Sequence, residues 1–550
     1  MLGMANCLLP RPWTAAALLA AFHLLLPPVQ AQAPPGSWEE WEARGARIAG
    51  LTVRIGDVFD PSLPDESHWL ARAANFVHIE TRRSVVEREL LFSPGNPVNA
   101  RAIRETERNL RALSFVRHAW VQPQPMDDGS VWAVVEVRDS WSLQGSLKFS
   151  RVGGQTSWRA RVHEVNFLGR GQRLILSHQR DPERTTDQAA YADPRFLGSR
   201  WALSLDYQRL SDGRRRAFAL DRPFFALHTP WSAYARASSL ETHLTLYDRG
   251  RAALGLPYRR HGAAIGWARG VPLAEDAALR VGAALEGEEA FYGTAAVFRP
   301  GWLAPAPFPD RRLHGLAVTV EWTQDRYLAF ENLRSVARTE DVNLGWTCKA
   351  TAGIYAGGLG SDEPGPFLRL SADKAWKWSE EGIFLAEARI QGRRSGRLWR
   401  EGLLSASWTA YLPGPGRQTF AGRFSADLAL RPPPEGWLYL GGEDGLRGYP
   451  NHYRAGDRRW VLSLEDRLVT DRRLWGLLQL GFVAYADAGA VRRLSGGSWS
   501  QTFADVGFGL RLGNLKSAFS NVLLVTIAFP LVDGPGVDDY QIVVGNVVRF

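Results

Sequence analysis

The stretch YQIVVGNVVRF at residues 540–550 alternates in polarity and ends in an aromatic residue. The odd-numbered positions hold Gln541, Gly545 and Arg549, with valines between them. A period of two predicts a β-strand, and a strand with one apolar side is typical of a barrel that faces lipid. An amphipathic strand of a soluble sandwich has the same period, so the rest of the chain decides between them. The apolar parity, which Asn546 alone breaks, consists of Tyr540, Ile542, Val544, Val548 and Phe550.

The first 31 residues predict a secretory signal peptide. Arg11 supplies a positive charge, and the run from Trp13 to Leu26 is mostly apolar. Val29-Gln30-Ala31 and Ala31-Gln32-Ala33 offer small-residue cleavage sites. No other stretch approaches the roughly 18 apolar residues of a membrane-spanning helix. Cys348 is then the one cysteine of the mature chain, since Cys7 lies in the signal. A closed barrel would hold an exported chain together without disulfides.

The composition argues against several classes of protein. The net charge of +9 is modest for 550 residues, and its arginines are scattered. We interpret them as lumen lining and as contacts with anionic lipid headgroups, with no nucleic-acid partner. Sixteen of the 22 tryptophans lie from Trp141 onward, which suits a barrel with aromatic residues at both membrane interfaces. Serine-hydrolase, phosphate-loop and zinc-binding motifs do not occur, so we expect no catalytic residue, metal or cofactor.

The chain divides near Trp141. Residues 32–47 form a short polar segment, residues 48–139 mix helix and strand, and residues 140–550 read as β throughout. In the middle part, Asn99 is an expected helix N-cap. The expected elements there are strands at 48–58, 116–122 and 131–137, and helices at 66–75, 81–91 and after Asn99. In the last part, alternating segments run at 142–151, 157–166, 200–209, 314–323, 367–374, 403–411 and 418–428. Counting such segments gives 16 to about 20 strands.

Residues 48–139 resemble a POTRA domain, a small α+β module found before outer-membrane barrels. The resemblance rests on the text RRSVVERELLFSPGNPV, on RAIRETERNLRALSFVRHAWVQ and on the strand VWAVVEVRD that follows. It covers about 90 residues, and one copy is present. The terminal aromatic of the closing strand also resembles the signal by which such barrels are assembled.

Two motifs resemble those of the BamA/TamA and two-partner-secretion transporter superfamily, also called the bacterial surface antigen family. Leu446-Arg447-Gly448-Tyr449 lies in a glycine-rich interval and resembles the arginine-glycine-aromatic motif of an inward-folded loop, here at about 429–457. The family has Val or Ile where this chain has Leu446. Tyr485-Ala-Asp487-Ala-Gly489 resembles the inner-wall motif that binds the loop arginine. The resemblance therefore implies an Arg447–Asp487 ion pair and a transmembrane antiparallel barrel of about 16 strands.

Two further features fit the same resemblance. Asn166, Gly169 and Gly171 resemble a turn on the periplasmic side of these barrels, and a glycine-rich hairpin turn is also its simplest interpretation. Glu465 would face the lumen on the strand after the inward loop.

The resemblance implies a non-enzymatic protein of the bacterial outer membrane with its POTRA domain in the periplasm. Its expected function is assembly, in which unfolded outer-membrane clients pair with the POTRA sheet edge and enter the membrane at the barrel seam. The alternative is export of one secreted partner through the lumen, although two-partner-secretion transporters carry two POTRA domains and a plug helix. Lipid transport stays open, and a passive porin would need neither motif. Expected partners are these clients, outer-membrane lipids, and periplasmic chaperones or lipoproteins.

Overall fold

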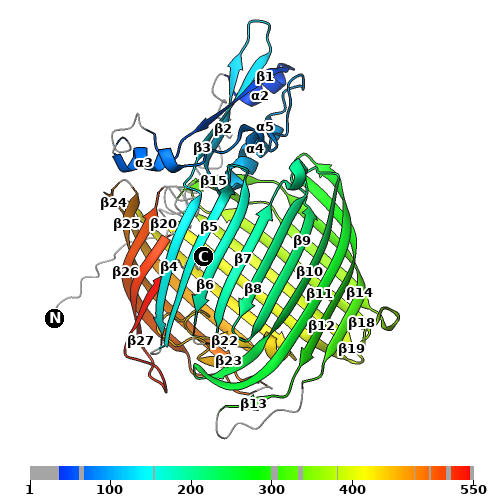
Figure 1. Ribbon diagram of the computed structural model, residues 1–550, viewed down its shortest axis with the longest axis vertical. Coiled ribbons are helices and arrows are strands. Elements are labelled where there is room, and N and C mark those ends of the chain that lie inside the picture. The colour runs from blue at the N-terminus through cyan, green and yellow to red at the C-terminus, as the bar shows by residue number, and fades with distance from the viewer. Residues whose placement is uncertain are drawn as a thin grey trace, which may run out of the picture.

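The computed structural model describes residues 36–60, 67, 69–152, 155–181, 183–298, 308–331, 333, 339–380, 382–475, 477–494, 497–515 and 522–545. The expected signal peptide at residues 1–31 lies outside the described residues, as do Val548 and Phe550. Figure 1 shows a small N-terminal domain at one end of a large barrel. We call this end of the barrel the domain end and the opposite one the far end. Among the described residues, no helix is long and apolar enough to cross a membrane.

The N-terminal domain contains a three-stranded sheet in the order β1-β3-β2, with β1 parallel and β2 antiparallel to β3. The strands lie where the sequence predicted them, and the predicted helices are shifted or shortened by a few residues. The elements are α2 (Trp38–Ala43), β1 (Ile48–Gly56), α3 (Trp69–Val77), α4 (Arg83–Glu87), α5 (Ala100–Ala112), β2 (Val116–Pro125) and β3 (Val131–Asp139).

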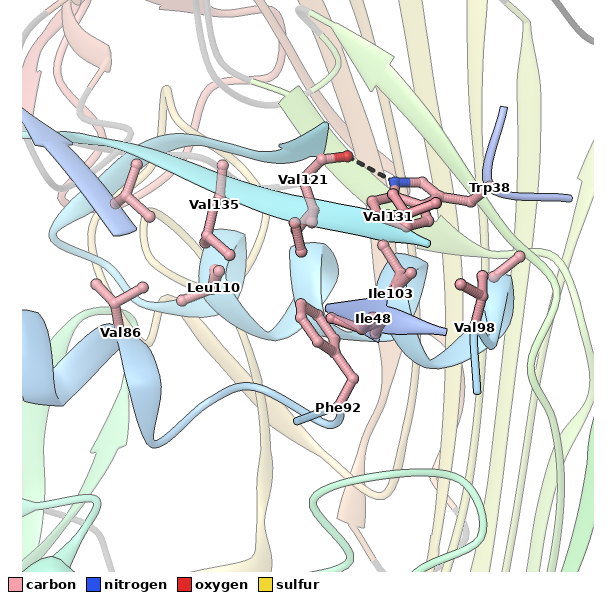
Figure 2. Close-up of a cluster of buried hydrophobic side chains, with 14 of the residues drawn as sticks. Trp38, Ile48, Val86, Phe92, Val98, Ile103, Leu110, Val121, Val131 and Val135 are labelled. Carbon is pink, nitrogen blue, oxygen red and sulfur yellow. Dashed lines mark hydrogen bonds between the residues drawn. The ribbon is translucent and has the colours of Figure 1, made fainter. Parts of the chain in front are cut away.

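The core of this domain lies between its sheet and its helices. Asn99 caps α5 by accepting a hydrogen bond from the Ala102 N–H at 2.8 Å, as the sequence predicted. The next turns of α5 bury Ile103 and Leu110 against the sheet, as Figure 2 shows. Apolar residues that share one face of α5 thus pack the helix against the sheet.

The rest of the chain forms an antiparallel barrel whose sheet order closes with β28 beside β4. Long strands joined by hairpins alternate in direction between the two ends. The wall strands are β4 (Leu143–Val152), β5 (Gln155–Phe167), β6 (Gln172–Arg180), β7 (Thr185–Asp193), β8 (Ala202–Leu210), β9 (Gly213–Arg222), β10 (Trp231–Asp248), β11 (Arg251–Ala274), β12 (Ala277–Tyr292), β14 (Arg311–Gln324), β17 (Thr347–Tyr355), β18 (Gly365–Lys377), β19 (Ile383–Ser395), β20 (Leu398–Pro413), β21 (Gln418–Leu430), β24 (Arg458–Leu474), β25 (Leu478–Arg492), β26 (Phe503–Asn514), β27 (Val522–Pro530) and β28 (Gln541–Gly545).

These are 20 wall strands within the described part of the chain, not the 16 that the resemblance implied. The two-residue β13 (Ala296–Val297) only adds a short pairing to β11. Counting segments of alternating polarity had given 16 to about 20 strands. The number implied by the family resemblance was therefore less accurate than the upper end of that count. An even number keeps β4 and β28 antiparallel where the sheet closes.

Each wall strand presents apolar side chains outward. Ile265 is 60% exposed and Leu316 57% exposed, and their cross-strand neighbour Leu285 is also exposed. On β14 the exposed positions Leu316, Val318 and Val320 alternate with buried or half-buried ones. An apolar outer surface with a closed hydrogen-bonded wall is the arrangement by which strands span a bilayer.

The N-terminal domain is fixed to the domain end of the barrel mainly through α5 and α4. Arg111 forms a bidentate ion pair with Asp341, at 2.9 and 3.0 Å. Arg108 binds Asp325 at 3.1 Å, directly after β14. Glu105 accepts a hydrogen bond from the Leu227 N–H in the turn between β9 and β10. The helix therefore contacts turns that are far apart in the barrel sequence.

Candidate functional site

The segment between β21 and β24 folds into the barrel from the far end, close to the predicted limits of 429–457. Its short strands, β22 (Leu438–Leu440) and β23 (Arg454–Gly456), pair antiparallel and lie at the far end in Figure 1. Leu440, Leu446 and Tyr449 are fully buried in one apolar cluster with Val461 and Phe503 of the wall. The segment, which we call the inward loop, is thus packed against the lumen side of β24 to β26.

Arg447 lies at the centre of this packing and is 3% exposed. Its Nε and Nη2 donate to the two carboxylate oxygens of Asp487 at 2.7 and 2.8 Å. Its Nη1 donates to Glu465 at 2.7 Å. The Tyr485 ring lies under the guanidinium, 3.4 Å from its carbon to the ring centroid. The structure therefore brings together Arg447 with Asp487 and Tyr485 of the second motif, and with the lumen-facing Glu465.

Arg467 extends this cluster toward the domain end. Its Nε donates to the second oxygen of Glu465 at 2.7 Å, and it is 4% exposed. Two buried arginines thus share two buried carboxylates in a region where an unpaired charge would be costly. We call this set the Arg447 cluster: Arg447, Glu465, Arg467, Tyr485 and Asp487. Sequence reasoning missed Arg467, although it follows Glu465 by two positions and therefore shares its face of the strand.

The glycines of both motifs are required by close approach. A Cβ on Gly448 would lie 2.7 Å from the Cβ of Asp505, and one on Gly489 would lie 2.9 Å from Leu440 of β22. Any side chain at these positions would push the inward loop off the wall. Next to Gly448, the Tyr449 hydroxyl lies 2.9 Å from the Ala504 carbonyl oxygen, to which it donates.

A second hairpin enters the lumen from the domain end. It consists of β15 (Tyr327–Glu331) and β16 (Thr339–Asn343), which pair with each other. Phe330 and Leu333 pack on the lumen-facing Tyr411 and Ile383 of the wall. The Leu333 carbonyl accepts a hydrogen bond from Arg467 at 3.1 Å. Nothing in the sequence distinguished this hairpin from an ordinary barrel hairpin.

The two insertions therefore connect the N-terminal domain to the inward loop through named contacts. Asp341 on β16 binds Arg111 of α5, and Leu333 of the same hairpin binds Arg467 of the Arg447 cluster. Within the described residues this path runs from the domain end to Asp487, well inside the barrel.

The predicted turn at Asn166 is a docking point for the N-terminal domain. The Asn166 side chain accepts from the Gly171 N–H at 2.7 Å and donates to Thr81 at 2.8 Å. Gly169 accepts from the Arg82 N–H, and a Cβ on Gly169 would lie 2.4 Å from the Glu80 carbonyl oxygen. Both glycines have positive φ, which glycine adopts without strain. The turn therefore fits closely beneath the start of α4.

The closing strand is described as far as Gly545. Tyr540 is 55% exposed and Ile542 48% exposed, whereas Gln541 between them is 3% exposed and faces the lumen. Val544 has the parity of Ile542. The alternation thus matches the predicted outward side for these positions.

Comparisons with known proteins give structural similarity only. No family model matches the sequence, and no curated protein matches it. Similar solved structures include CdiB from Escherichia coli, at 15% identity and TM-score 0.46, covering 90% of this chain and 75% of that one. Others are BamA from Haemophilus ducreyi lacking POTRA domains 1–3 (13%, 0.36, 90% and 84%) and CdiB from Acinetobacter baumannii (12%, 0.40, 90% and 73%).

Proposed function

We propose that this protein is an outer-membrane assembly factor whose N-terminal domain, a POTRA domain in the periplasm, receives unfolded clients for insertion at the barrel seam. The observation that carries the proposal is the buried Arg447 cluster, which holds the inward loop against the lumen wall. A passive pore has no use for such a cluster. Since one insertion enters the lumen from each end, we propose that a client uses a sheet edge and the wall instead.

One edge of the N-terminal sheet is closed to a client. The Val121 N–H donates to Glu107 at 2.7 Å, and the Val121 carbonyl accepts from Trp38 at 2.7 Å, the bond dashed in Figure 2. Burial raises the pKa of Glu107, and the bond to Val121 offsets part of that effect. Pro123 and Pro125 share the parity of Val121 and have no N–H to donate. Strand β2 therefore lacks a free backbone ladder along this edge.

The opposite edge, β1, is covered only at its start. The Ile48 N–H and carbonyl bond to Asn96 and Gly95. From Gly50 to Gly56, β1 has β3 on its inner side and no strand on its outer side among the described residues. An unpaired edge takes up an extended chain through main-chain hydrogen bonds. We therefore assign client pairing to β1 rather than β2.

The seam between β28 and β4 is the proposed place of insertion. Strand β28 stands next to β4 in the closed sheet order and pairs with β27 along Gln541–Gly545. Gly545 is the last described residue of the strand, and Asn546 lies outside the described residues. Glycine weakens strand pairing, which would favour opening at this position.

Export of a single partner through the lumen is the second candidate. It is favoured by the polar lining toward the far end, where a cavity of about 440 Å³ is bordered by charged side chains. These include Arg260, Arg311, Arg393, Glu288 and Glu401. Such a lining suits an unfolded polar chain, but passage would require the inward loop to leave the lumen.

Depletion of the protein followed by quantitative outer-membrane proteomics separates these candidates. Assembly predicts that many barrel proteins decline together. Loss of one secreted or surface protein with the other barrels unchanged would favour export. No change in any client would contradict both and direct attention to lipid transport.

A further inference from the structure

The outer surface of the barrel carries a cluster of positive charge at its far end. On β8 to β14 the outward positions beyond the apolar band are rich in arginine. Register places Arg209 opposite Arg214, Arg214 opposite Glu241, and Glu241 opposite Arg259. The next set of cross-strand partners, nearer the apolar band, runs from Arg216 on β9 to Arg312 on β14. It also contains His261 and Glu289. We call the following five exposed residues the arginine belt: Arg209, Arg214, Arg216, Arg259 and Arg312.

The belt sits directly beside apolar positions of the same strands. Outward-facing Phe218 follows Arg216 by two residues on β9, and Leu316 follows Arg312 by four on β14. On β11, Ile265 to Leu273 form the outward apolar band, broken by Arg269, and Arg259 lies beyond its far-end limit. Strands of about ten residues cross the hydrocarbon core. The belt therefore lies where the headgroups of one leaflet begin.

Two of these arginines converge on one aromatic ring. The guanidinium carbons of Arg259 and Arg312 lie 5.6 and 5.7 Å from the centroid of the Phe291 ring. The His261 ring is 6.3 Å from the same centroid. A planar guanidinium held over a ring keeps its N–H groups directed outward for a phosphate. Arginine forks match phosphate oxygens in bidentate geometry.

The belt has an excess of positive charge. Arg214 binds Glu241 at 3.0 Å, and Glu289 faces His314 at 3.4 Å. Within the part of the chain that the structure describes, Arg209, Arg216, Arg259 and Arg312 have no carboxylate at ion-pair distance. Midway along the opposite wall the outward positions are apolar, such as Leu404, Phe424 and Leu464, and the exposed Arg394 and Arg397 lie at its far end in the β19–β20 hairpin. An anionic group is therefore attracted to the belt.

We propose that the arginine belt binds the phosphates of a phosphorylated glycolipid in the outer leaflet of the membrane. The inference rests on the proposed outer-membrane location, which puts the far end in that leaflet. Phosphate monoesters at the headgroup level supply the charge that the belt lacks, and acyl chains would lie along the apolar band below it. The bound lipid would then lie against β8 to β14, away from the seam at β28 and β4.

The test uses the full chain in detergent, with native mass spectrometry to measure binding of diphosphorylated lipid A, its dephosphorylated form and phosphatidylglycerol. We expect the wild type to prefer diphosphorylated lipid A over the dephosphorylated form by at least about tenfold. The triple variant R216Q/R259Q/R312Q should lose this preference. The matched triple variant R394Q/R397Q/R417Q removes the same charge from exposed sites elsewhere and should keep it.

Equal affinity in the belt variant and the matched variant would overturn the proposal. Equal binding of phosphatidylglycerol and lipid A would overturn the assignment to a glycolipid, since any anionic lipid would then serve. If the triple variant fails to fold, as judged by heat-modified gel mobility, R259Q alone tests the site against R397Q. The readout involves no client, so its failure is separate from failure of the proposed assembly function.

Discussion

The guanidinium of Arg447 is bound by both carboxylate oxygens of Asp487, at 2.7 and 2.8 Å, across 40 positions of sequence. The contact joins a loop that enters from the far end to the inner face of β25. Since both side chains are almost fully buried, the pair fixes one conformation of the loop more than it stabilises the fold.

Removing the arginine should release the inward loop. In Arg447→Ala, Asp487 and Glu465 would be left as buried carboxylates without their shared partner, at a cost of about 3–5 kcal/mol. Limited proteolysis within residues 431–457 should then occur at the variant but not at the wild type. Arg447→Lys keeps the charge and loses the fork, so it should give intermediate protection.

A charge swap tests the same pair from the other side. Because Glu465 also binds Arg447, exchanging Arg447 and Asp487 leaves a new carboxylate beside Glu465. Arg467 still offsets the charge of Glu465 in this double variant. If the double variant is no better protected than R447D or D487R alone, the Arg447–Asp487 contact does not hold the loop.

The glycine of the first motif should be intolerant of even one methyl group. Gly448→Ala would place a Cβ 2.7 Å from the Cβ of Asp505 and 3.1 Å from the Pro530 nitrogen. The backbone nitrogen is not free to move aside, so we expect the loop to shift and become protease-sensitive. Gly358→Ala is the control, because a Cβ there meets nothing within 4 Å. Equal resistance of the two variants would contradict the close packing described above.

Docking of the N-terminal domain and burial of the inward loop should be energetically coupled. The path runs from Arg111 through Asp341 and Leu333 to Arg467. Arg111→Gln should therefore raise proteolysis of the inward loop several-fold, and adding Asp341→Asn should change little further, because the pair is already broken. Arg83→Gln removes an exposed arginine–glutamate pair on α4 and serves as the control. Loop protection that is independent of Arg111 would show that the hairpin transmits nothing.

A photoreactive residue placed on each edge strand of the N-terminal sheet should show which edge binds the client. Arg54 on β1 and Gln122 on β2 are both exposed, so either site accepts a crosslinking side chain. We expect an unfolded barrel client to crosslink at position 54 and not at 122. Crosslinking mainly at 122 would mean that the client displaces Trp38 and Glu107 from Val121.

Much of the fold follows from the sequence, because polarity alternation in a wall strand depends on each strand alone. The strands at 142–151, 314–323 and 418–428 were predicted within a few residues of their observed bounds. The count of 20 was less accessible, since short hairpins such as β8–β9 and β15–β16 have the same pattern whether they form the wall or enter the lumen. A hairpin of the wall differs from one that enters the lumen only in the strands with which it pairs, and these strands can be distant in sequence.

The Arg447 cluster was partly predictable for a related reason. The two motifs indicated Arg447, Asp487 and the lumen-facing Glu465, but Arg467 gains its role from the Leu333 carbonyl, a backbone atom 134 positions away. The closed β2 edge was equally hidden, because Trp38 and Glu107 reach Val121 from separate helices. Such contacts between distant segments leave no local trace in the sequence.

The most direct test of the assembly function is reconstitution of the purified full chain in liposomes with a urea-denatured barrel client. The folded fraction of the client is measured by heat-modified gel mobility and protease resistance. Assembly predicts that folding is faster with the wild type than with empty liposomes, and that Arg447→Ala loses most of the gain. A client that folds at the same rate with and without the protein would contradict the assembly function.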